Sequence, residues 1–401
     1  MQKNAIMQKV ARVAFVVIIA AMLFLFFSND FGLVDIHKAS IVVAVGVDYG
    51  EEGYAVTAQA AVPTPAQGSG STAYTQVTGK GATVADAVDD INSKTGFYPK
   101  LAFCNLIVLG ESCASENLFT VLDYFYRNDY VPLTALVGMC GGSAQQLLSS
   151  KPADGSMSSS AIQRAMSEEL KNSGNCSTVN LKLIAQDWGS PSAAAFMPYI
   201  TTAQAGGGGT APASGMGSSG GSSGGSEKSS EQKSAEFTCL TTAAFAGGKF
   251  VGVLDEEQAF ALNLIRSNVR HAVINTVCEG VDYTVGLKNN SGTAKMDAEG
   301  EKPVLKIKFR ALANIQATES RPAAKGSANS HLVSDEVLSC TADTIEKAFS
   351  SLLNFCKSTS CDLVGAERML CAYHNKLYKK LKGEVLSKMD TQYDVVIKSV
   401  R

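Results

Sequence analysis

The chain has 401 residues, of which 45% are hydrophobic and 18% are charged, and its formal net charge at pH 7 is −2. Its Lys and Arg residues form no dense patch, so the composition gives no electrostatic reason to expect a nucleic-acid-binding protein. Ten cysteines in a chain of this length do not make a small disulfide scaffold. The length allows two or three ordinary domains once non-globular segments are subtracted.

An unbroken apolar run, VAFVVIIAAMLFLFF, occupies residues 13–27 behind a basic N-terminal tail. Lys3, Lys9 and Arg12 precede the run without any acidic residue, which predicts that residues 1–12 form a cytoplasmic tail. A helix over the run alone covers roughly 22 Å of a hydrocarbon core of about 30 Å, and the apolar residues that follow can lengthen it. We therefore expect a single membrane anchor at 13–34, with the rest of the chain extracytoplasmic.

A cleaved signal peptide is the alternative, because its apolar region has a similar length. Cleavage sites favour small residues in an A-x-A-like pattern, whereas this run ends in FLFFSN, with bulky Phe at most positions. A lipoprotein leader would need a cysteine directly after the run, and the first cysteine is Cys104. An uncleaved anchor fits these residues better than either leader does.

The segment 205–236 consists mainly of Gly and Ser and contains almost no large apolar side chain. Such a composition cannot bury enough surface to offset chain entropy, which predicts a flexible linker. A glycine-rich phosphate-binding loop does not fit, because no strand leads into the segment and no GK[ST] sequence follows it. The linker divides the chain into an N-terminal domain at 35–204 and a C-terminal domain at 237–401.

The N-terminal domain opens with two β-rich runs, at 41–47 and 54–62, separated by the turn sequence DYGEEG, which predicts a hairpin. Thr83 is expected to cap a helix that has Val84, Ala87, Val88 and Ile91 on one apolar face. A hairpin followed by alternating strands and helices predicts an α+β fold with mixed or antiparallel pairing. The other predicted elements are strands at 74–78, 101–110 (buried and central) and 131–139, and helices at 115–128, 143–149, 159–172 and 178–187.

The C-terminal domain is also predicted to be α+β, and it opens with a hairpin around Gly247 and Gly248, where positive φ costs little. Asp255 is expected to cap a helix that extends to about Arg266. Residues 304–317 alternate apolar with polar or basic side chains, which predicts a strand with one face in solvent. The other predicted elements are a long helix at 334–357, a second helix at 364–386 and a closing strand at 391–400.

No catalytic, cofactor-binding or metal-ligating constellation can be assembled from the sequence, so we expect a protein that is not an enzyme. Cys371 and His374 stand three residues apart and, with Cys361, are the nearest approach to a metal site, but no second close pair accompanies them. Cys371 is expected to be a packed core residue, as are most of the cysteines. If the domains are exported, some cysteines could pair, and Cys356, Cys361 and Cys371 are the closest group.

Adjacent acidic residues occur at Glu51–Glu52 and Glu256–Glu257. Neighbouring side chains point apart on a strand or helix, so these acids are expected to be solvated turn and cap charges rather than a glycosidase pair. Arg266 and Arg270 are likewise expected to form a solvated face. The three histidines without a neighbouring motif, expected on the surface or in loops, are His37, His271 and His331.

Five stretches carry a resemblance to a known family, in order along the chain. The two that open the N-terminal domain are DIHKASIVVAVGVDYGEEGYAVTAQAAVP and GKGATVADAVDDIN. They are followed by PKLAFCNLIVLGESCASENLFTVLDYFYRNDYVPLTALVGMCGGSAQQLL, then by FTCLTTAAFAGGKFVGVLDEEQAFALNLIR, and finally by DLVGAERMLCAYHNKLYKKL through YDVVIKSVR. Their succession resembles the Ger(x)C family, the C subunits of bacterial spore nutrient-germinant receptors, over nearly the whole ordered chain.

The resemblance implies a non-enzymatic receptor subunit on the outer face of the inner spore membrane, without a cofactor and without nucleic acid. It would lie beside a transporter-like multi-pass subunit and a second receptor subunit, and would couple nutrient sensing to germination through protein–protein contacts. Members are typically lipoproteins, whereas Asp30 stands here near the place of the modified cysteine, so a spanning helix would supply the tether. The Gly/Ser-rich segment at 205–236 is a second departure from the pattern of the family.

Two other classes stay open on the residues alone. One is a membrane-anchored extracytoplasmic enzyme, such as a wall hydrolase, whose site would assemble from distant residues. The other is an envelope solute-binding or adhesion module. A neighbouring gene for a multi-pass transporter-like protein would favour the receptor subunit over both.

Overall fold

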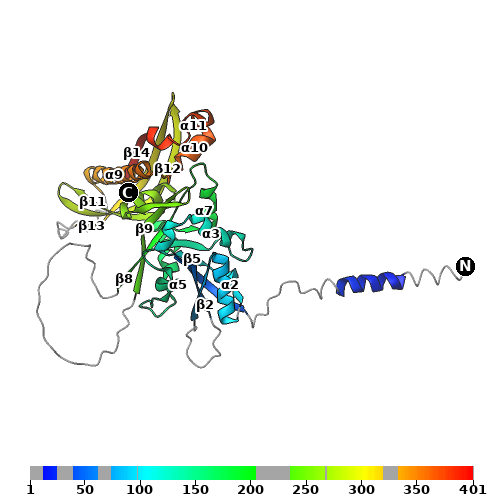
Figure 1. Ribbon diagram of the computed structural model, residues 1–401. Helices are drawn as coiled ribbons and strands as arrows, with labels where there is room; N and C mark the ends of the chain where they lie inside the picture. Colours follow the sequence, from blue (N-terminus) through cyan, green and yellow to red (C-terminus); the bar gives the residue numbers. More distant parts are fainter. Residues whose placement is uncertain are drawn as a thin grey trace, which may run out of the picture.

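The computed structural model describes residues 12–24, 39–61, 74–96, 98–204, 235–266, 269–318 and 333–400 (Figure 1). Residues 12–24 form a helix, which covers the first part of the predicted anchor, while 25–34 lie outside the described residues. None of the helices within the described ranges has both the length and the apolar character needed to cross a bilayer. Most of the predicted linker, 205–234, also lies outside them.

The larger of two sheets contains ten strands in the described part of the chain. They are β1 (Ala39–Gly50), β2 (Gly53–Ala61), β3 (Tyr74–Gly81), β4 (Tyr98–Lys100), β5 (Leu106–Leu109), β6 (Leu136–Cys140), β7 (Val179–Asn180), β8 (Ala194–Gln204), β9 (Ala235–Ala246) and β10 (Lys249–Leu254). Their order is β10-β9-β8-β6-β5-β1-β2-β3, with β4 beside β1 and β7 beside β6. The middle strands β8, β6, β5 and β1 are parallel, and the outer pairs are antiparallel, which confirms the predicted mixed sheet.

Strand β5 lies at the centre of this sheet because its sequence, LIVL, is apolar on both faces. Ile107 and Leu109 pack into the core on one face, together with residues of α2 (Val84–Thr95), α3 (Leu118–Arg127) and α7 (Leu181–Trp188). Leu106 and Val108 pack on the opposite face against α4 (Ala144–Ser149) and α5 (Ser158–Ala165), with α6 (Glu168–Ser173) following. The sheet is therefore covered by helices on both faces.

The predicted capping and face of α2 are confirmed. The hydroxyl of Thr83 accepts a hydrogen bond from the backbone N–H of Asp86 at 3.1 Å. The buried side chains of the helix are the four at the predicted helical spacing, Val84, Ala87, Val88 and Ile91. A capped N-terminus and one apolar stripe are together sufficient to fix this helix against β2 and β3.

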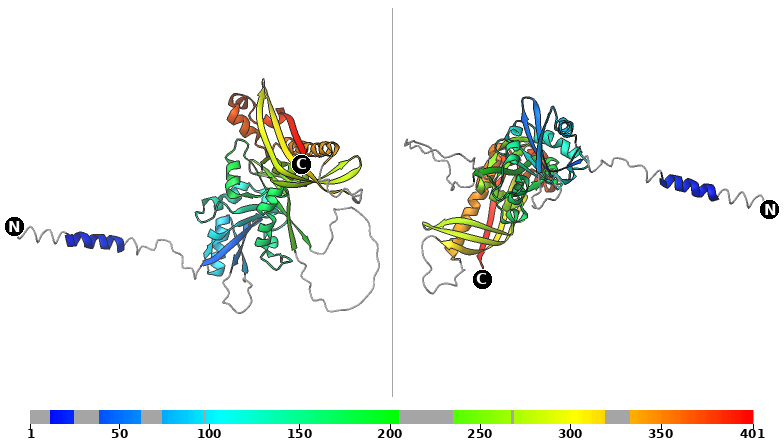
Figure 2. Two further views of the ribbon diagram at one scale, coloured as in Figure 1. Left: turned by 180° about the vertical axis from the view of Figure 1, so that it is seen from behind. Right: turned by 90° about the horizontal axis from the view of Figure 1, so that it is seen from below.

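The second sheet has four described strands in the order β11-β12-β13-β14. They are β11 (His271–Cys278), β12 (Val281–Glu299), β13 (Lys302–Thr318) and β14 (Asp390–Ser399). Leu305, Ile307 and Phe309 on β13 are fully buried, while the Lys308 and Arg310 side chains are exposed, so the predicted one-sided strand is confirmed. The β12–β13 hairpin projects from the body beside α10 (Ala366–Tyr373) and α11 (Asn375–Leu381) (Figures 1 and 2).

The long helix α9 (Asp335–Thr359) lies across this second sheet (Figures 1 and 2). Ser334 caps it, and its buried face includes Ile345, Phe349 and Leu352. Phe349 packs edge-on to Phe309 of β13, with 6.3 Å between the ring centroids. Helix α8 (Glu256–Arg266) packs against α9, and the same apolar core continues from here into the larger sheet.

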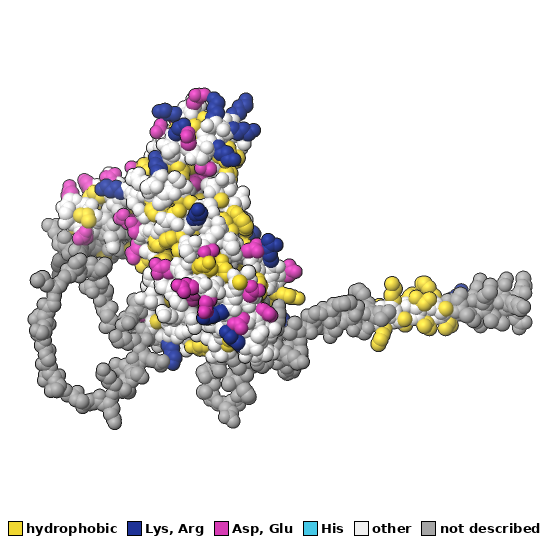
Figure 3. Space-filling model, viewed as in Figure 1, with side chains coloured by type: hydrophobic (Ala, Val, Ile, Leu, Met, Phe, Trp, Pro, Cys, Tyr) yellow, Lys and Arg dark blue, Asp and Glu magenta, His cyan; other side chains and the backbone are white. Residues whose placement is uncertain are grey.

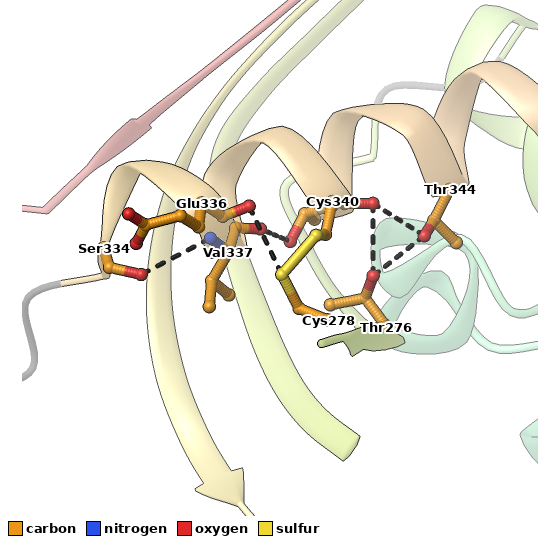
Figure 4. The surroundings of a disulfide bond; sticks show 8 residues. Thr276, Cys278, Ser334, Glu336, Val337, Cys340 and Thr344 are labelled. Atoms are coloured by element: carbon orange, nitrogen blue, oxygen red, sulfur yellow. Dashed lines mark hydrogen bonds between the residues drawn. A yellow bond between two sulfur atoms is a disulfide. The ribbon is translucent and has the colours of Figure 1, made fainter. Parts of the chain in front are cut away.

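A disulfide joins Cys278, at the end of β11, to Cys340 on α9 (Figure 4). The hydroxyls of Thr276 and Thr344 lie 2.8 Å apart beside it, and both groups donate to the carbonyl oxygen of Cys340. The sequence pointed instead to the closely spaced group near residue 360, whose members are unpaired in the structure. The expectation based on spacing along the chain was therefore wrong. Strand pairing and helix packing bring together two cysteines that are 62 positions apart.

The predicted boundary at 205–236 does not separate the two sheets. Strand β9 begins at Ala235 and pairs with β8 across the linker, and β10 then completes the larger sheet at Leu254. The turn between β9 and β10 has positive φ at Gly247 (57°) and Gly248 (82°), as predicted. Sequence composition could not reveal that the chain, after Ala235, returns to the sheet that it left at Gln204.

Four other predicted elements are shorter or divided in the structure. The apolar stretch at 101–110 forms a 3₁₀ turn, η2 (Leu101–Phe103), before β5, and Phe103 is exposed. The strand predicted at 131–139 begins only at Leu136. The helix predicted at 159–172 is divided into α5 and α6, and that at 364–386 into α10, α11 and α12 (Val385–Lys388).

Candidate functional site

The carboxyl ends of β1, β5 and β6 meet at one edge of the larger sheet, a place where open α/β sheets often bind ligands. Asp48 lies there, but its carboxylate is used by the chain itself. It accepts hydrogen bonds from the Ser143 hydroxyl (2.9 Å) and from the backbone N–H groups of Ala144 (2.8 Å) and Gln145 (3.0 Å). Asp48 therefore anchors the N-terminus of α4 and has a structural task.

The other acidic side chain at this edge is also occupied. Glu111 accepts a hydrogen bond from the backbone N–H of Gly142 at 3.0 Å, and its own N–H donates to the carbonyl of the same residue at 2.8 Å. The Ser112 hydroxyl accepts from the backbone N–H of Tyr49 at 2.9 Å. With its polar groups satisfied in this way, the edge is not the candidate site.

A larger groove opens next to it, with a volume of about 1200 Å³, and shares Tyr49 with the edge. The groove is built from the β1–β2 turn, the start of α2, the outer face of α3, the segment that follows α7, and the β9–β10 turn. Asn117 connects two of these elements, since its side chain caps α3 at the Phe119 N–H (2.9 Å) and donates to the Gly247 carbonyl (3.3 Å). We refer to this feature as the α3 groove.

Aromatic side chains form much of the α3 groove. The rings of Phe119 and Trp188 are stacked, with centroids 4.2 Å apart and planes 8° from parallel. Phe119 is buried, whereas 45% of Trp188 is exposed, so the indole presents a free surface to the groove. Tyr49 and Tyr54 form a second pair, with centroids 5.0 Å apart. Aromatic side chains with one open face are common in surfaces that bind proteins or ligands.

The charges that line the α3 groove are mainly negative. Four carboxylates and one guanidinium line it, from Glu51, Glu52, Glu116, Asp123 and Arg127. Two of the acids have basic partners, because Asp123 pairs with the lining arginine at 2.7 Å and Glu52 pairs with a lysine of β3 at 2.9 Å. Among the described residues no ion pair engages Glu51 or Glu116. Figure 3 shows acidic, basic and apolar side chains intermingled on the lower body, and a group of Lys and Arg side chains, with some acids among them, at the tip formed by α10, α11 and the β12–β13 hairpin.

Two tyrosines of the groove, Tyr49 and Tyr54, are hydrogen-bonding groups rather than bases. The charge of Glu116, together with its hydrogen bond to the Tyr49 hydroxyl, raises the pKa of Tyr49. Burial and the same carboxylate raise the pKa of Tyr54. Both phenols therefore stay protonated at neutral pH. The groove can bind a cationic group through carboxylates, hydroxyls and aromatic faces.

The metal-ligand candidates do not come together. Cys361 is buried and its thiol donates to the Phe245 carbonyl at 3.3 Å, while Cys371 is half-buried on α10 and His374 follows that helix. Within the described ranges no group of three or more His, Cys, Asp or Glu side chains is placed to hold a metal ion. The expectation of a core position is confirmed for most of the cysteines, since seven of the eight free ones are buried.

The predicted positions of both acidic pairs and of one histidine are confirmed. Glu256–Glu257 lie in the first turn of α8, as predicted, and Glu51–Glu52 lie in the β1–β2 turn. The latter pair also lines the α3 groove, a role that the sequence did not indicate. His271 is exposed at the start of β11, as predicted, whereas His37 and His331 lie outside the described residues.

Arg266 contradicts the prediction of a solvated arginine pair. Its guanidinium donates to the Asp187 carboxylate at 2.7 Å and to the Leu363 carbonyl at 3.0 Å, and its side chain is 19% exposed. It also lies over the ring of Phe196, 5.2 Å from the centroid. Only Arg270 of the pair is exposed. The apolar residues before Arg266 on α8 gave no sign of the acidic partner, which lies 79 positions away.

Sequence models of two known domain families match the chain. The one described as "Spore germination protein N-terminal domain" matches residues 33–202, and the one described as "Spore germination B3/ GerAC like, C-terminal" matches residues 241–401. No curated protein sequence matches the chain. A solved structure titled "Crystal Structure of the GerBC protein" is similar with a TM-score of 0.50 and 16% identity, and the match covers 92% of this chain and 100% of that chain. At this identity the likeness shows a shared α+β fold.

Proposed function

This chain belongs to the Ger(x)C family of spore germinant-receptor C subunits, and we propose that it couples nutrient sensing to germination through protein–protein contacts, without enzymatic activity. The observation that carries the proposal is the pair of family matches, which together extend over residues 33–202 and 241–401. The α3 groove supports it as well, because its lining favours recognition of a binding partner over bond-making chemistry.

The proposal includes a location and two partners. The body would lie on the outer face of the inner spore membrane, beside a transporter-like multi-pass subunit and a second receptor subunit. The predicted anchor at 13–34 would hold it there in the membrane. Within the described part of this segment the side chains of Phe15, Val16 and Val17 are each at least 60% exposed, so they have no packing role in the folded body.

Co-purification tests the subunit role directly. A tagged chain, gently solubilised from spores, is expected to bring down a multi-pass membrane protein, and a deletion strain is expected to lose its response to at least one nutrient. Complementation by the intact gene should restore that response. Recovery of the chain alone, together with normal germination of the deletion strain towards every nutrient, would refute the proposal.

Anchoring is tested by charge placed within the apolar run. The double substitution Leu23→Lys and Phe24→Lys, in the middle of the predicted anchor, is expected to release the protein from the membrane fraction, because each lysine costs about 3 kcal/mol at the centre of a spanning helix. The matched control is Val273→Lys with Val277→Lys, two exposed valines of β11, and it should stay in the membrane fraction. A wild-type chain found trimmed and free in the medium would favour the cleaved leader instead.

A further inference from the structure

The α3 groove has a lining that selects for positive charge. Glu51 and Glu116 are its two acids without an ion-pair partner in the described part of the chain, and Trp188 supplies a half-exposed aromatic face in the same groove. Carboxylates and aromatic faces both attract ammonium and guanidinium groups, and Arg in particular can pair with the first and stack on the second. The groove thus combines two independent attractions for one kind of side chain.

The size of the groove favours a polypeptide over a small nutrient. Sites for small molecules have volumes of about 300–1,000 Å³ and enclose most of their ligand. The α3 groove, at about 1200 Å³, is larger than that and is shaped by five separate segments of the surface. Trp, Tyr and Arg are also the residue types most enriched among the energetic hot spots of protein interfaces.

We propose that the α3 groove binds a basic segment of a partner protein, one of whose Arg or Lys side chains contacts Glu51, Glu116 and Trp188. The segment would need positive charge together with apolar residues, since the lining offers both kinds of partner. This inference rests on the proposed role as a subunit that acts through protein contacts. It adds the place of contact and the chemistry of the partner.

Trp188 is the only tryptophan of the chain, so its fluorescence reports on this groove alone. The full-length protein in detergent is titrated with the peptide acetyl-Arg-Ala-Leu-Arg-Ala-Leu-amide. We expect a saturable change in the emission, weakened by added salt because the contacts are partly electrostatic. The peptide with Glu in place of Arg should give no saturable change.

The variant that tests the site is Glu51→Gln with Glu116→Gln, which keeps the shape of both side chains. Loss of two charge contacts should weaken the binding of the basic peptide about tenfold. The control is Glu168→Gln with Glu169→Gln on α6, which changes the net charge equally outside the groove and should leave the affinity within about twofold. Thermal unfolding of both variants verifies that they are folded.

Three results would overturn the inference: no saturable signal, equal weakening in the control variant, or binding of free arginine amide as tight as that of the peptide. The last result would indicate a small-cation site. If partner subunits co-purify although the peptide does not bind, this inference fails while the proposed function stands. If the peptide binds but no partner is recovered and germination is normal, the inference that the groove binds a basic segment stands and the proposed function fails.

Discussion

The cysteines show how burial determines the chemistry of a single residue. All ten lie in the described ranges: two form the disulfide, seven are buried thiols, and Cys371 is half-buried. Burial raises the pKa of four thiols to about 12, those of Cys104, Cys113, Cys140 and Cys356. At pH 8 only about one in ten thousand of each is the reactive thiolate.

Thiol labelling of the native protein is therefore expected to be selective. With iodoacetamide at pH 8, one cysteine should react quickly and the other seven free thiols slowly, because those seven are buried and the reagent cannot reach them. The substitution Cys371→Ser should remove the fast phase, and labelling in denaturant should reveal all eight free thiols. Two or more fast thiols in the native protein would contradict the packing described for these residues.

Asp48 is the second residue whose role the structure defines. Its three hydrogen bonds hold the N-terminus of α4, and a methyl group at Gly110 would lie 1.9 Å from its Oδ1, so the carboxylate fills the space that the glycine leaves. Replacing Asp48 by Ala should lower the free energy of unfolding by about 1–3 kcal/mol, measured in urea. Asp86→Ala, on the exposed surface of α2, is the control, and an equal loss there would contradict a special role for Asp48.

At the scale of elements, the disulfide fastens the edge strand β11 to α9. The two cysteines are separated by 62 positions, so the bond restricts a long loop in the unfolded chain. The double substitution Cys278→Ser and Cys340→Ser should lower the free energy of unfolding by about 2–5 kcal/mol. A reductant should cause a similar loss in the wild type and none in the variant. If the reductant destabilises both proteins equally, another bond is responsible.

Helical periodicity was the most reliable signal for the elements. The buried face of α9 contains Val337, Thr341, Ile345, Ala348 and Leu352, which recur at helical spacing, because a helix of 25 residues repeats its apolar stripe many times. Short apolar runs were less informative, since the stretch at 101–110 is divided between a turn and a strand. Strands β11 and β12 were not predicted. Polar side chains occupy both faces of β12, whereas β11 contains the β-branched residues Val273, Ile274 and Val277, a signal that could have found it.

The candidate site was the part that the sequence could least reveal. The lining of the α3 groove comes from segments as far apart as the β1–β2 turn and the β9–β10 turn, and none of them carries a motif. Glu51–Glu52 were correctly assigned to a turn, yet their place in a groove depends on α3 and on the end of α7. Such a site exists only after the sheet has formed.

At the scale of the whole molecule, the two sheets are joined through one continuous core and through Arg266 at the end of α8. This arginine reaches Asp187 at the end of α7, Phe196 on β8 and the carbonyl of Leu363 in the segment after α9. The first two partners belong to the larger sheet and its helices, and the third belongs to the part built on the second sheet. Its planar guanidinium can satisfy all three contacts at once, which the point charge of lysine cannot.

Removing this arginine should therefore weaken the whole fold. Arg266→Met leaves the Asp187 carboxylate buried without its cation, which should lower the free energy of unfolding by about 3–5 kcal/mol. Arg266→Lys should recover only part of the loss. The double variant Arg266→Met with Asp187→Asn should lose less stability than the two single variants lose together. The difference should be about 1–3 kcal/mol, because the two residues share one interaction.

Urea unfolding followed in parallel by Trp188 fluorescence and far-UV circular dichroism measures these losses. The fluorescence reports on the larger sheet, because Trp188 stacks on Phe119 of α3, while the dichroism reports on both sheets and their helices. If Arg266 joins the two parts, the two transitions coincide in the wild type and separate in Arg266→Met. Exposed Arg270→Met should change the stability by no more than about 0.5 kcal/mol. An Arg266→Met protein as stable as this control would show that the apolar core alone holds the sheets together.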